Sequence, residues 1–427
     1  MDIDNLYKLF LKHNSVQTDT RHLKQGDLFF ALKGPNFNGN AFAQQALDQG
    51  AAYAVIDDPT YTVPGKTYLV NDCLTGLQLL AKHHRRQFTI PIIAITGSNG
   101  KTTTKELVHA VLSSTYRTYT TEGNLNNHIG VPLTILKIKK DAEFAVIEMG
   151  ANHVGEIASY CNITVPTHGL ITNCGKAHLE GFGGIEGVRK GKGELFDFLR
   201  QYNGGAFVMW DYEYLRPMCK GIQRVYKYGT AETELVGNTI GEDTLMRIQF
   251  TKGHDASLST KLAGNYNLPN VLAAVAVGKF FHVPDEKIDK AIESYTPSNS
   301  RSQLMQRSSN RIILDAYNAN PSSMNVAIEH FSKQQGPKIL ILGGMAEMGS
   351  ESLKEHQNVI DEIKKHDWKD VVLVGGDFLK LEHPYTQLSS SPEAGEWLQK
   401  NRIENSSLLI KGSRSMQMEK VLDYLNY

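Results

Sequence analysis

Cysteine is scarce in the chain, and the few cysteines follow no disulfide or metal-binding pattern. Only four occur in 427 residues. None forms a Cys-x-x-Cys pair or stands close to histidines, and they are Cys73, Cys161, Cys174 and Cys219. Both a disulfide scaffold and a structural zinc site need such spacing, so both are disfavoured. The scarcity fits a reducing compartment, and we expect a cytoplasmic protein.

Long hydrophobic runs are also missing. The longest apolar run, VLAAVAVG at 271–278, is far shorter than the roughly 20 residues that a membrane-spanning helix needs. The opening segment, MDIDNLYKLFLKHN, has no basic stretch followed by an apolar one, as a signal peptide would have. We therefore expect no membrane span.

The chain has no excess of charge of either sign. Its 45 Lys and Arg residues balance 45 Asp and Glu residues, so no overall field attracts nucleic acid or an anionic membrane. No nucleic-acid partner is expected, and any anion site must be local.

What the chain has is a recurring alternation of short apolar runs and helical stretches. Residues 1–85 predict a small N-terminal α/β domain. Residues 86–297 carry β-branched strands joined by helical segments, which predict a central domain with a mostly parallel sheet. A polar segment at 294–303 is the predicted linker, and four further apolar strands within residues 298–427 predict a C-terminal Rossmann-like α/β domain.

The stretch IIAITGSNGKTTTKE at 92–106 runs from an apolar strand through a glycine turn into a helix. Glycines let backbone N–H groups point inward, the helix dipole adds partial positive charge, and Lys101 adds a full charge. The spacing is a variant, since Gly97 and Gly100 enclose two residues rather than four. The alternative is a plain strand-to-helix turn with a solvated lysine.

We interpret this stretch as a P-loop in a mononucleotide-binding domain, with a Mg²⁺ ion on the hydroxyl group of Thr102. The predicted ATP-phosphate site comprises Thr96, Gly97, Ser98, Asn99, Gly100, Lys101, Thr102 and Thr103.

Two polar residues follow other strands of the central domain. Glu148 ends the strand of FAVIEMG, and His178 lies in ITNCGKAHLEGFGG, after an apolar strand. The carboxyl ends of parallel strands meet at one edge, so both side chains could reach a metal ion bound to nucleotide phosphates. Alone, a strand-end Glu is as often a helix cap, and a lone His is more often an ordinary hydrogen-bonded residue. Together with the P-loop they predict metal ligands.

Two pairs of polar residues accompany predicted helices. Lys190 and Lys192 stand in EGVRKGKGELFDFL, where the residues by themselves indicate a solvated basic turn. Asn267 and Asn270 stand one helical turn apart before an apolar helix. Helix capping explains one asparagine but not both.

These motifs resemble the Mur ligases, ATP-dependent amide-forming enzymes of peptidoglycan synthesis with a three-domain architecture, over nearly the whole chain. The shortened loop TGSNGKTTTKE is what that family carries, and the stretch TDTRHLKQGDLFFALKGPNFNGNAFAQQALDQGA is similar to its nucleotide-sugar domain. Four stretches look like the member that adds D-alanyl-D-alanine to UDP-N-acetylmuramoyl-tripeptide: GNLNNHIGVPLT, VIEMGANHVGEI, YNANPSSM and IKGSRSMQME.

The resemblance implies catalytic roles for matched residues. Lys101 and Thr102 would hold the ATP phosphates and a Mg²⁺ ion, while Glu148 and His178 would hold a second Mg²⁺ ion. Lys192 matches a lysine that is carbamylated in the family and becomes an anionic metal bridge, with the nearby Lys190 as the alternative.

The resemblance also implies substrate contacts. The ATP contacts outside the P-loop would be Asn267, Asn270, Arg301 and Asp315, the last two bringing the C-terminal domain onto ATP. The UDP end would be held by Asp19, Thr20 and Arg21, the muramoyl and phosphate region by Asn126 and Asn127, and the incoming dipeptide by Tyr317, Asn318 and Asn320.

Three residues depart from the family pattern. Tyr266 stands where His is frequent, so we expect the adenine pocket to differ in shape. Gly191 replaces a usual Ala in the helix of Lys192, at roughly 1 kcal/mol of helix propensity. Gly344 stands where Asp is common, which removes a carboxylate from the C-terminal cleft.

The implied partners are small molecules, and a monomer is expected. A sister ligase that adds one amino acid is the nearest alternative, although the D-N-P-R acceptor motif of one such enzyme is absent. A folylpolyglutamate synthase shares the P-loop but would lack the N-terminal domain. A nucleotide-dependent switch is the alternative of another class, and it has no need of Glu148, His178 and Lys192. The third peptide residue, a diamino acid or lysine, and the base that deprotonates the amine stay open.

Overall fold

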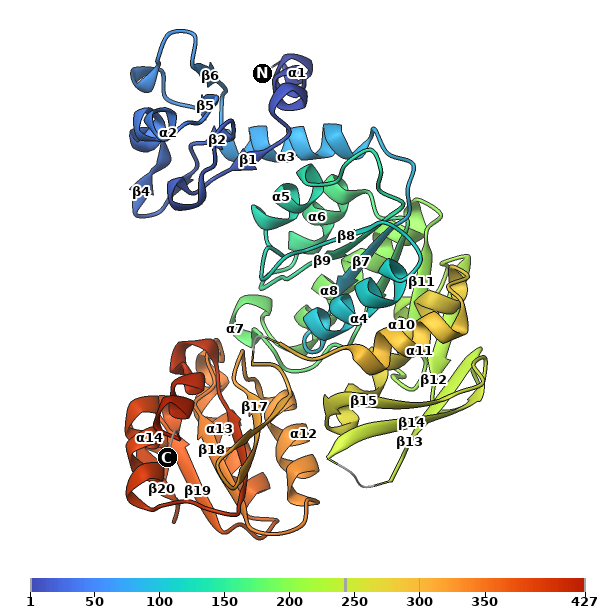
Figure 1. Ribbon diagram of the computed structural model, residues 1–427, viewed down its shortest axis with the longest axis vertical. Coiled ribbons are helices and arrows are strands. Elements are labelled where there is room, and N and C mark those ends of the chain that lie inside the picture. Colours follow the sequence, from blue (N-terminus) through green and yellow to red (C-terminus); the bar gives the residue numbers. More distant parts are fainter. Residues whose placement is uncertain (1, 242–243, 299, 426–427) are drawn as a thin grey trace.

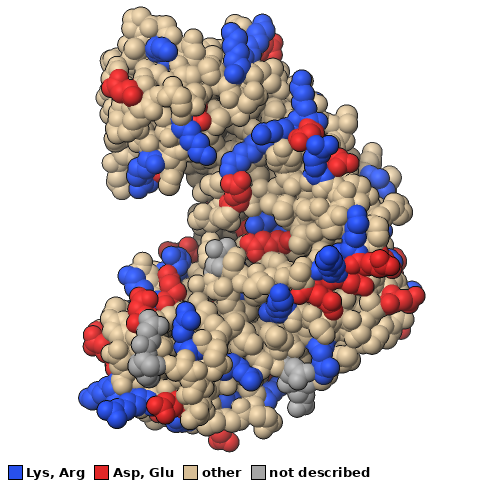
Figure 2. Space-filling model, in the orientation of Figure 1, with Lys and Arg blue, Asp and Glu red and all other residues tan. Residues whose placement is uncertain are grey.

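Three α/β bodies follow one another along the long axis in the computed structural model, which describes residues 2–241, 244–298 and 300–425. The N-terminal body (blue), the central body (cyan to yellow) and the C-terminal body (orange and red) each carry their own sheet (Figure 1). Figure 2 shows that the molecule is hollowed between the N-terminal and C-terminal bodies. This arrangement confirms the predicted three-domain α/β fold class.

The N-terminal body contains a small sheet with the order β1-β2-β5-β6, in which all neighbouring strands are parallel. Its strands are β1 Val16–Gln17, β2 Leu28–Phe30, β5 Tyr53–Ile56 and β6 Thr67–Leu69, with a separate hairpin of β3 Lys33–Gly34 and β4 Phe37–Asn38. Its helices are α1 Ile3–His13, α2 Ala43–Asp48 and α3 Cys73–Arg85.

The central sheet has the order β15-β14-β13-β12-β11-β10-β7-β9-β8. Every pair is parallel except β13 with β14 and β14 with β15. The strands are β7 Ile92–Thr96, β8 Thr118–Thr120, β9 Phe144–Glu148, β10 His168–Ile171, β11 Gly205–Met209, β12 Arg224–Gly229, β13 Leu235–Ile240, β14 Leu245–Lys252 and β15 Ser257–Ala263. The predicted parallel strands are confirmed as β7, β9, β10 and β11, while the antiparallel extension was not predicted.

Helices cover both faces of the central sheet, which explains why β7, β9 and β10 consist entirely of buried residues. The helices are α4 Lys101–Ser113, α5 Gly130–Leu136, α6 Glu156–Thr164, α7 Leu179–Phe182, α8 Ile185–Gln201, α9 Leu215–Met218, α10 Leu268–Phe280 and α11 Asp285–Ser294. Helices α4, α10 and α11 pack together, and α5, α6 and α8 form a second layer with α3.

Helix α3 joins the N-terminal and central bodies. It begins after Asp72, whose carboxylate accepts the N–H of Thr75 at 2.6 Å. It packs against α1 as well as against α5 and α6 of the central body. At its end the buried guanidinium of Arg85 donates to the carbonyl oxygens of Thr164 (2.7 Å) and Val165 (3.1 Å). The apolar cores of the two bodies are therefore continuous.

The C-terminal body contains a sheet with the order β16-β17-β21-β18-β19-β20, parallel except for β16. Its strands are β16 Gln303–Arg307, β17 Asn310–Asp315, β18 Lys338–Gly343, β19 Asp370–Val374, β20 Thr386–Leu388 and β21 Ser407–Lys411. Its main helices are α12 Pro321–Ser332, α13 Ser352–Ile363 and α14 Ser391–Lys400. One apolar cluster lies on each face of this sheet.

The segment between the central and C-terminal bodies follows the end of α11. It is tied to the central body by Tyr295, whose hydroxyl group donates to the Glu106 carboxylate at 2.6 Å. Residue 299 of the predicted linker and residues 426–427 of the predicted third domain lie outside the described residues. The exact domain boundaries stay a prediction.

The longest apolar run of the sequence belongs to α10. All of residues 271–278 are buried, because this helix packs against α4 and against β11, β12 and β13. Within the described ranges, no helix combines the length and the apolar character that crossing a bilayer requires.

A buried histidine of β10 predicts a loss of stability in acid. His168 packs against Phe280 and Phe281 with ring centroids 5.4 and 5.0 Å away, and its Nε2 is buried without a partner among the described residues. Burial, assisted by Arg224, lowers its pKa to about 4. The unfolded chain then binds more protons than the folded chain between about pH 6.5 and pH 4, so stability falls as the pH falls.

We expect His168 to remove about 2 kcal/mol from the free energy of unfolding between pH 7 and pH 5. His168→Gln should lose this pH-dependent part, whatever its stability at pH 7. Urea unfolding at the two pH values, followed by fluorescence, measures the difference for both chains. Equal losses in the two chains would contradict the assignment.

Candidate active site

A cavity of about 970 Å³ lies between the central and C-terminal bodies. It opens at the carboxyl ends of β7 and β9, where parallel sheets bind ligands. The predicted residues that line it are Ser98, Asn99, Gly100, Lys101, Thr102, Thr103, Asn126, Asn127, Glu148, His178, Asn267, Asn270, Arg301, Asp315, Tyr317, Asn318 and Asn320. The predicted residues outside its lining are Thr96, Gly97, Lys192, Asp19, Thr20 and Arg21.

Two glycines give the loop between β7 and α4 its shape. Gly97 has a φ of +143° and Gly100 a φ of +79°, which side-chain-bearing residues rarely adopt. A Cβ atom on Gly97 would lie 2.0 Å from Oγ1 of Thr172, and one on Gly100 would lie 2.5 Å from Oδ1 of Asn270. Both positions therefore require glycine.

The segment after β10 accepts hydrogen bonds from this loop. Asn173 accepts the N–H of Ser98 at its carbonyl oxygen (2.9 Å) and the N–H of Asn99 at Oδ1 (3.0 Å). The first helical bond of α4 joins the N–H of Thr104 to the carbonyl oxygen of Gly100 at 2.8 Å. The N–H groups before Thr104 at the start of α4 thus have no helical acceptor and suit an anion. Sequence reasoning missed Asn173, although it lies just beyond the end of β10, as Glu148 lies at the end of β9.

Lys101 curls back over the loop. Its Nζ donates to the carbonyl oxygens of Gly97 (2.8 Å) and Ser98 (3.1 Å). Burial lowers its pKa to about 8, while the nearby Glu148 carboxylate acts in the opposite direction. The amine still carries a proton in most molecules at pH 7, so a positive charge stands beside the loop.

Glu148 has the features of a metal ligand. Its Oε1 accepts hydrogen bonds from Oγ1 of Thr102 (3.2 Å) and Nδ2 of Asn126 (2.7 Å). Its Oε2 is buried and has no partner among the described residues. Leaving a buried carboxylate oxygen unpaired is costly, and a Mg²⁺ ion, which prefers oxygen ligands, would satisfy it. The donor set of Glu148 and Thr102 therefore fits Mg²⁺.

His178 lines the same cavity from the segment after β10. It precedes α7 with a φ of +52°, and its Nδ1 pairs with Oε2 of Glu347 in the C-terminal body. In the described part of the chain, no three His, Cys, Asp or Glu side chains gather closely enough to hold a metal by themselves. A metal here would also need nucleotide or water ligands, as Mg²⁺ usually has.

The structure separates the two candidate lysines of α8. Lys190 is exposed, whereas Lys192 is 1% exposed. Nζ of Lys192 donates to the carbonyl oxygen of Ala151 (2.9 Å) and lies 4.9 Å from the ring centroid of Phe182. Burial, and next the charge of Lys101, lower its pKa to about 7. A neutral amine is the form that can react with carbon dioxide, so Lys192 is the better candidate for carbamylation.

Phe182 also explains the unusual glycine beside Lys192. A Cβ atom on Gly191 would lie 2.5 Å from Cε1 of the Phe182 ring. The ring occupies the space that an alanine methyl group would need, which explains why residue 191 is glycine although it lies within α8.

Asn267 and Asn270 form a buried pair in the cavity wall. Nδ2 of Asn270 donates to Oδ1 of Asn267 at 2.9 Å, and Oδ1 of Asn270 accepts from Oγ1 of Thr104 at 3.0 Å. This chain of bonds links the start of α10 to α4 directly under Gly100. The pair therefore lines the cavity and also holds α10 and α4 together beside it.

The C-terminal wall carries a cation that sequence reasoning missed. Lys411, at the end of β21, is 2% exposed and its Nζ pairs with Oδ2 of Asp315 at 2.5 Å. Oδ1 of Asp315 accepts the N–H of Ser302 at 3.1 Å. The guanidinium carbon of Arg301 lies 3.5 Å from the ring centroid of Tyr317. The stretch IKGSRSMQME contains Lys411, and its place at a strand end was the available signal.

The dipeptide loop predicted at 317–320 touches the P-loop directly. Asn320 caps α12 through a bond from the N–H of Ser323 at 3.0 Å. Its Nδ2 also donates to Oδ1 of Asn99 at 2.7 Å. Asn318 accepts the N–H of Ala319 at its own Oδ1 (2.9 Å), which holds the loop in its turn. The phosphate site and the C-terminal loop therefore meet in one cavity.

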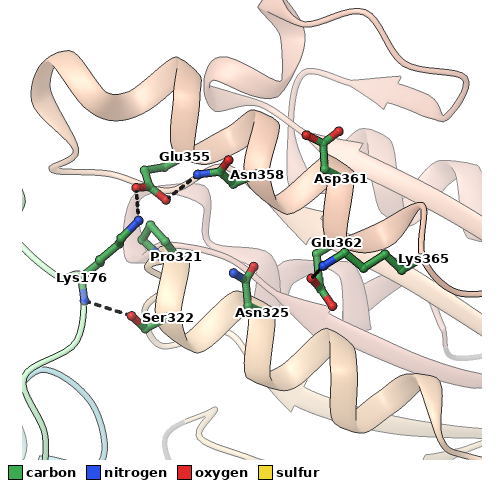
Figure 3. A pocket seen from close by; sticks show the side chains of 9 residues that line it. All are labelled: Lys176, Pro321, Ser322, Asn325, Glu355, Asn358, Asp361, Glu362 and Lys365. Atoms are coloured by element: carbon green, nitrogen blue, oxygen red, sulfur yellow. Dashed lines mark hydrogen bonds and ion pairs between the residues drawn. The ribbon is translucent and has the colours of Figure 1, made fainter.

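A second contact joins the central and C-terminal bodies across their boundary, which we call the domain seam. It lies beside a smaller pocket of about 380 Å³ (Figure 3). Lys176 of the central body reaches Glu355 of α13, with Nζ 2.6 Å from the carboxylate. The N–H of Lys176 donates to Oγ of Ser322 at 2.9 Å. The Glu355 side chain is only 4% exposed. Lys176 stands two residues before His178 in the sequence.

The residues predicted for the sugar nucleotide are divided between two places. Asn126 and Asn127 lie in the cavity, where Oδ1 of Asn127 accepts the N–H of Gly130 at 2.9 Å. Asp19 and Arg21 lie in the N-terminal body and form an ion pair at 2.7 Å. The guanidinium of Arg21 holds the pKa of Asp19 down to about 2. These residues keep their predicted roles as proposals.

Two departures have a structural account. A Cβ atom on Gly344 would lie 2.7 Å from Cα of Gly376, so the close approach of two backbones excludes a side chain. The Tyr266 hydroxyl group and Oγ of Ser302 are hydrogen-bonded at 3.0 Å. Tyr266 thus connects the start of α10 to the C-terminal body.

The fold and the site define a multidomain α/β protein whose phosphate-binding loop faces a second α/β domain across a polar cavity. Three stretches match known families: residues 12–85 match the Mur ligase family catalytic domain, residues 95–278 the Mur ligase middle domain, and residues 300–414 the Mur ligase glutamate ligase domain. The chain belongs to the Mur ligase family.

Relatives match almost the full length. The UDP-N-acetylmuramoyl-tripeptide–D-alanyl-D-alanine ligases of Bacillus subtilis and Escherichia coli are each 34% identical, covering 96% of this chain and 92% and 93% of their own lengths. The crystal structure of MurF from Acinetobacter baumannii has a TM-score of 0.87 at 30% identity, covering 96% of this chain and 93% of that one. MurF ligase from Thermotoga maritima in complex with ADP has a TM-score of 0.87 at 26% identity, covering 97% and 98%.

Proposed function

We propose that the chain is an ATP-dependent ligase that joins D-alanyl-D-alanine to UDP-N-acetylmuramoyl-tripeptide, with ADP and phosphate as by-products, in cytoplasmic peptidoglycan precursor synthesis. The observation that carries the proposal is the shared cavity, in which Asn320 of the C-terminal loop bonds to Asn99 of the P-loop. The relatives with this printed activity, similar over nearly the whole chain, support it. We also propose that the chain acts as a monomer.

The chemical need is to make a carboxylate react with an amine. At neutral pH the carboxylate is a poor electrophile, so it must first receive a good leaving group. The terminal carboxylate of the tripeptide attacks the γ-phosphorus of ATP, the bond from that phosphorus to the bridging oxygen breaks, and ADP leaves. The free amine of D-alanyl-D-alanine then attacks the carbonyl carbon of the acyl phosphate, the bond from that carbon to the phosphate oxygen breaks, and the nitrogen loses a proton as phosphate leaves.

The P-loop and Lys101 would stabilise the phosphoryl group during transfer. The N–H groups at the start of α4 and the positive charge of Lys101, whose Nζ is held by two carbonyl oxygens of the loop, would stand beside it before the reaction. Charge placed in advance in this way stabilises a transferring phosphoryl group. Thr102 would hold one Mg²⁺ ion at the ATP phosphates, Glu148 and His178 would hold a second, and both ions would neutralise phosphate charge. As a carbamate, Lys192 would supply a further anionic metal ligand.

The C-terminal body would exclude water from the acyl phosphate, which hydrolyses in open solvent. Arg301 and Asp315 line the cavity from that side, and Asn267 and Asn270 line it from the central body. Tyr317, Asn318 and Asn320 would face the dipeptide. Asp19, Thr20 and Arg21 would hold the UDP end, with Asn126 and Asn127 nearer the muramoyl group.

The alternatives predict different products. A sister ligase would add a single amino acid to a shorter precursor, and a nucleotide-dependent switch would release ADP at a rate that does not depend on D-alanyl-D-alanine. The folylpolyglutamate synthase of Thermotoga maritima shares the fold at 13% identity and a TM-score of 0.62, covering 82% of this chain. That likeness concerns fold alone.

The mass of the product tests the proposal. UDP-N-acetylmuramoyl-tripeptide, ATP and D-alanyl-D-alanine are incubated with the chain, and mass spectrometry should find the precursor enlarged by one dipeptide minus water. D-alanine alone serves as the matched acceptor control and should give no product. A product with one added alanine, or ADP release that does not respond to the dipeptide, would overturn the proposal.

A further inference from the structure

One pair of side chains connects the C-terminal body to the candidate metal ligand His178. Oε2 of Glu347 pairs with Nδ1 of His178, and the two residues stand on loops of different bodies. Both have a left-handed backbone, with φ of +52° for His178 and +61° for Glu347. Residues other than glycine adopt this conformation at a free-energy cost, so the surrounding structure must hold both in place.

The pairing uses one ring nitrogen and leaves the other free. A neutral imidazole with its proton on Nδ1 donates to Glu347 and keeps a lone pair on Nε2. No hydrogen bond to Nε2 of His178 occurs among the residues that the structure describes. The ring lines the cavity that also contains Glu148, whose Oε2 is buried without a partner.

The two bodies also pack against each other around α7, which follows His178. A Cβ atom on Gly349 would lie 3.2 Å from Cβ of Glu180, so the loop after Glu347 lies close against α7. On its other side, a Cβ atom on Gly181 would lie 2.4 Å from the carbonyl oxygen of Asn152. This short helix is therefore enclosed between the segment after β9 and the C-terminal loop.

We propose that Glu347 is a positioning residue that acts across the domain seam. By accepting the Nδ1 proton of His178 it fixes the tautomer and the orientation of the ring, so that Nε2 faces the divalent cation of the nucleotide site. Carboxylates that orient metal-bound histidines in this way raise metal affinity, and their loss typically lowers it about 10- to 100-fold. The inference rests on the proposed function, because it assigns that cation to His178.

The competing explanation is that Glu347 only clamps the two bodies together. The Lys176–Glu355 pair provides a matched control, because it crosses the same seam (Figure 3) and does not contact His178. A clamp residue would affect closure of the cavity and thus ATP binding. A positioning residue would affect the metal first.

The experiment measures Mn²⁺ binding to the full chain with bound ADP, by electron paramagnetic resonance of free Mn²⁺. The variants are Glu347→Ala, Glu347→Gln, Glu355→Gln and His178→Ala, the last giving the loss of affinity when the ring is absent. We expect a weakening of about 10-fold or more for Glu347→Ala. Glu347→Gln, whose amide oxygen can still accept the proton, should lie between that variant and the unchanged chain. Glu355→Gln should bind Mn²⁺ as the unchanged chain does.

Steady-state kinetics give a second readout. Glu347→Ala should raise the Mg²⁺ concentration needed for half-maximal rate, with little change in the KM for ATP at saturating Mg²⁺. Equal Mn²⁺ affinity of Glu347→Ala and the unchanged chain, or equal weakening by Glu355→Gln, overturns the inference. No effect of His178→Ala on Mn²⁺ overturns it as well. A chain that makes no dipeptide product but shows the expected Mn²⁺ series refutes the proposed function alone.

Discussion

Replacing Lys101 with alanine is expected to lower the rate of ADP release by about 10³-fold or more, because a positioned cation on a transferring phosphoryl group has effects of that size. Lys101 stands at the start of α4, and its Nζ is held by the carbonyl oxygens of Gly97 and Ser98. The charge therefore lies beside the helix N–H groups that suit phosphate. A coupled assay of ADP release in the presence of both acceptor substrates measures the effect.

Binding of the sugar nucleotide should survive this change, since its predicted contacts lie elsewhere. Calorimetry with UDP-N-acetylmuramoyl-tripeptide tests that the variant is folded and competent to bind. Lys140→Ala, which removes an exposed lysine of the same body, is the matched control and should react normally. Substantial turnover by Lys101→Ala would defeat the assignment of the P-loop.

Replacing Lys192 with alanine should cause the second large loss, about 10²- to 10³-fold in kcat, as expected for removing a buried electrostatic group of an active site. The lysine is buried, its pKa is lowered to about 7, and it lies against the carbonyl oxygen of Ala151. If its carbamate supplies an anionic ligand, a short carboxylic acid such as acetate can enter the vacated space. Partial rescue of the rate by acetate is the expected signature.

Lys190→Ala is the control for this experiment, because Lys190 lies two residues away and is exposed. It should keep its activity and respond to acetate no more than the unchanged chain. The unchanged chain should lose activity when bicarbonate and carbon dioxide are removed and recover it when bicarbonate is added. Independence of bicarbonate, together with no rescue of Lys192→Ala, would refute the carbamate.

The buried strands of the fold could be predicted because their residues are almost all apolar. The cores of β7 and β18 consist of IIAI and ILIL, which only a sheet covered on both faces accommodates. The edge strands β8, β16 and β20 escaped prediction, since none of them contains a fully buried residue or a continuous apolar run. The antiparallel pair β14 and β15 alternates buried and exposed residues, a pattern that the search for continuous apolar runs passes over.

The residues of the candidate site also divide into those that the sequence predicts and those that only the structure reveals. Local order along the chain revealed the P-loop, because strand, glycines, lysine and helix are consecutive. The sequence alone could not choose between Lys190 and Lys192, which differ in burial and not in local pattern. Pairs that join distant segments, such as Glu347 with His178 and Lys411 with Asp315, leave no trace in spacing. The first pair follows from how the central and C-terminal bodies pack, and the second from the pairing of β17 with β21, in which Asp315 and Lys411 stand in register.

Helix α3 holds the N-terminal and central bodies in one relative position. The helix contacts both bodies, and the Arg85 guanidinium donates hydrogen bonds to the carbonyl oxygens of Thr164 and Val165. These contacts oppose independent movement of the N-terminal and central bodies. If the N-terminal body holds the uridine end, as we propose, the length of the precursor decides how far its peptide reaches toward the P-loop. Under that proposal, contacts far from the reacting atoms would distinguish precursors of different peptide length.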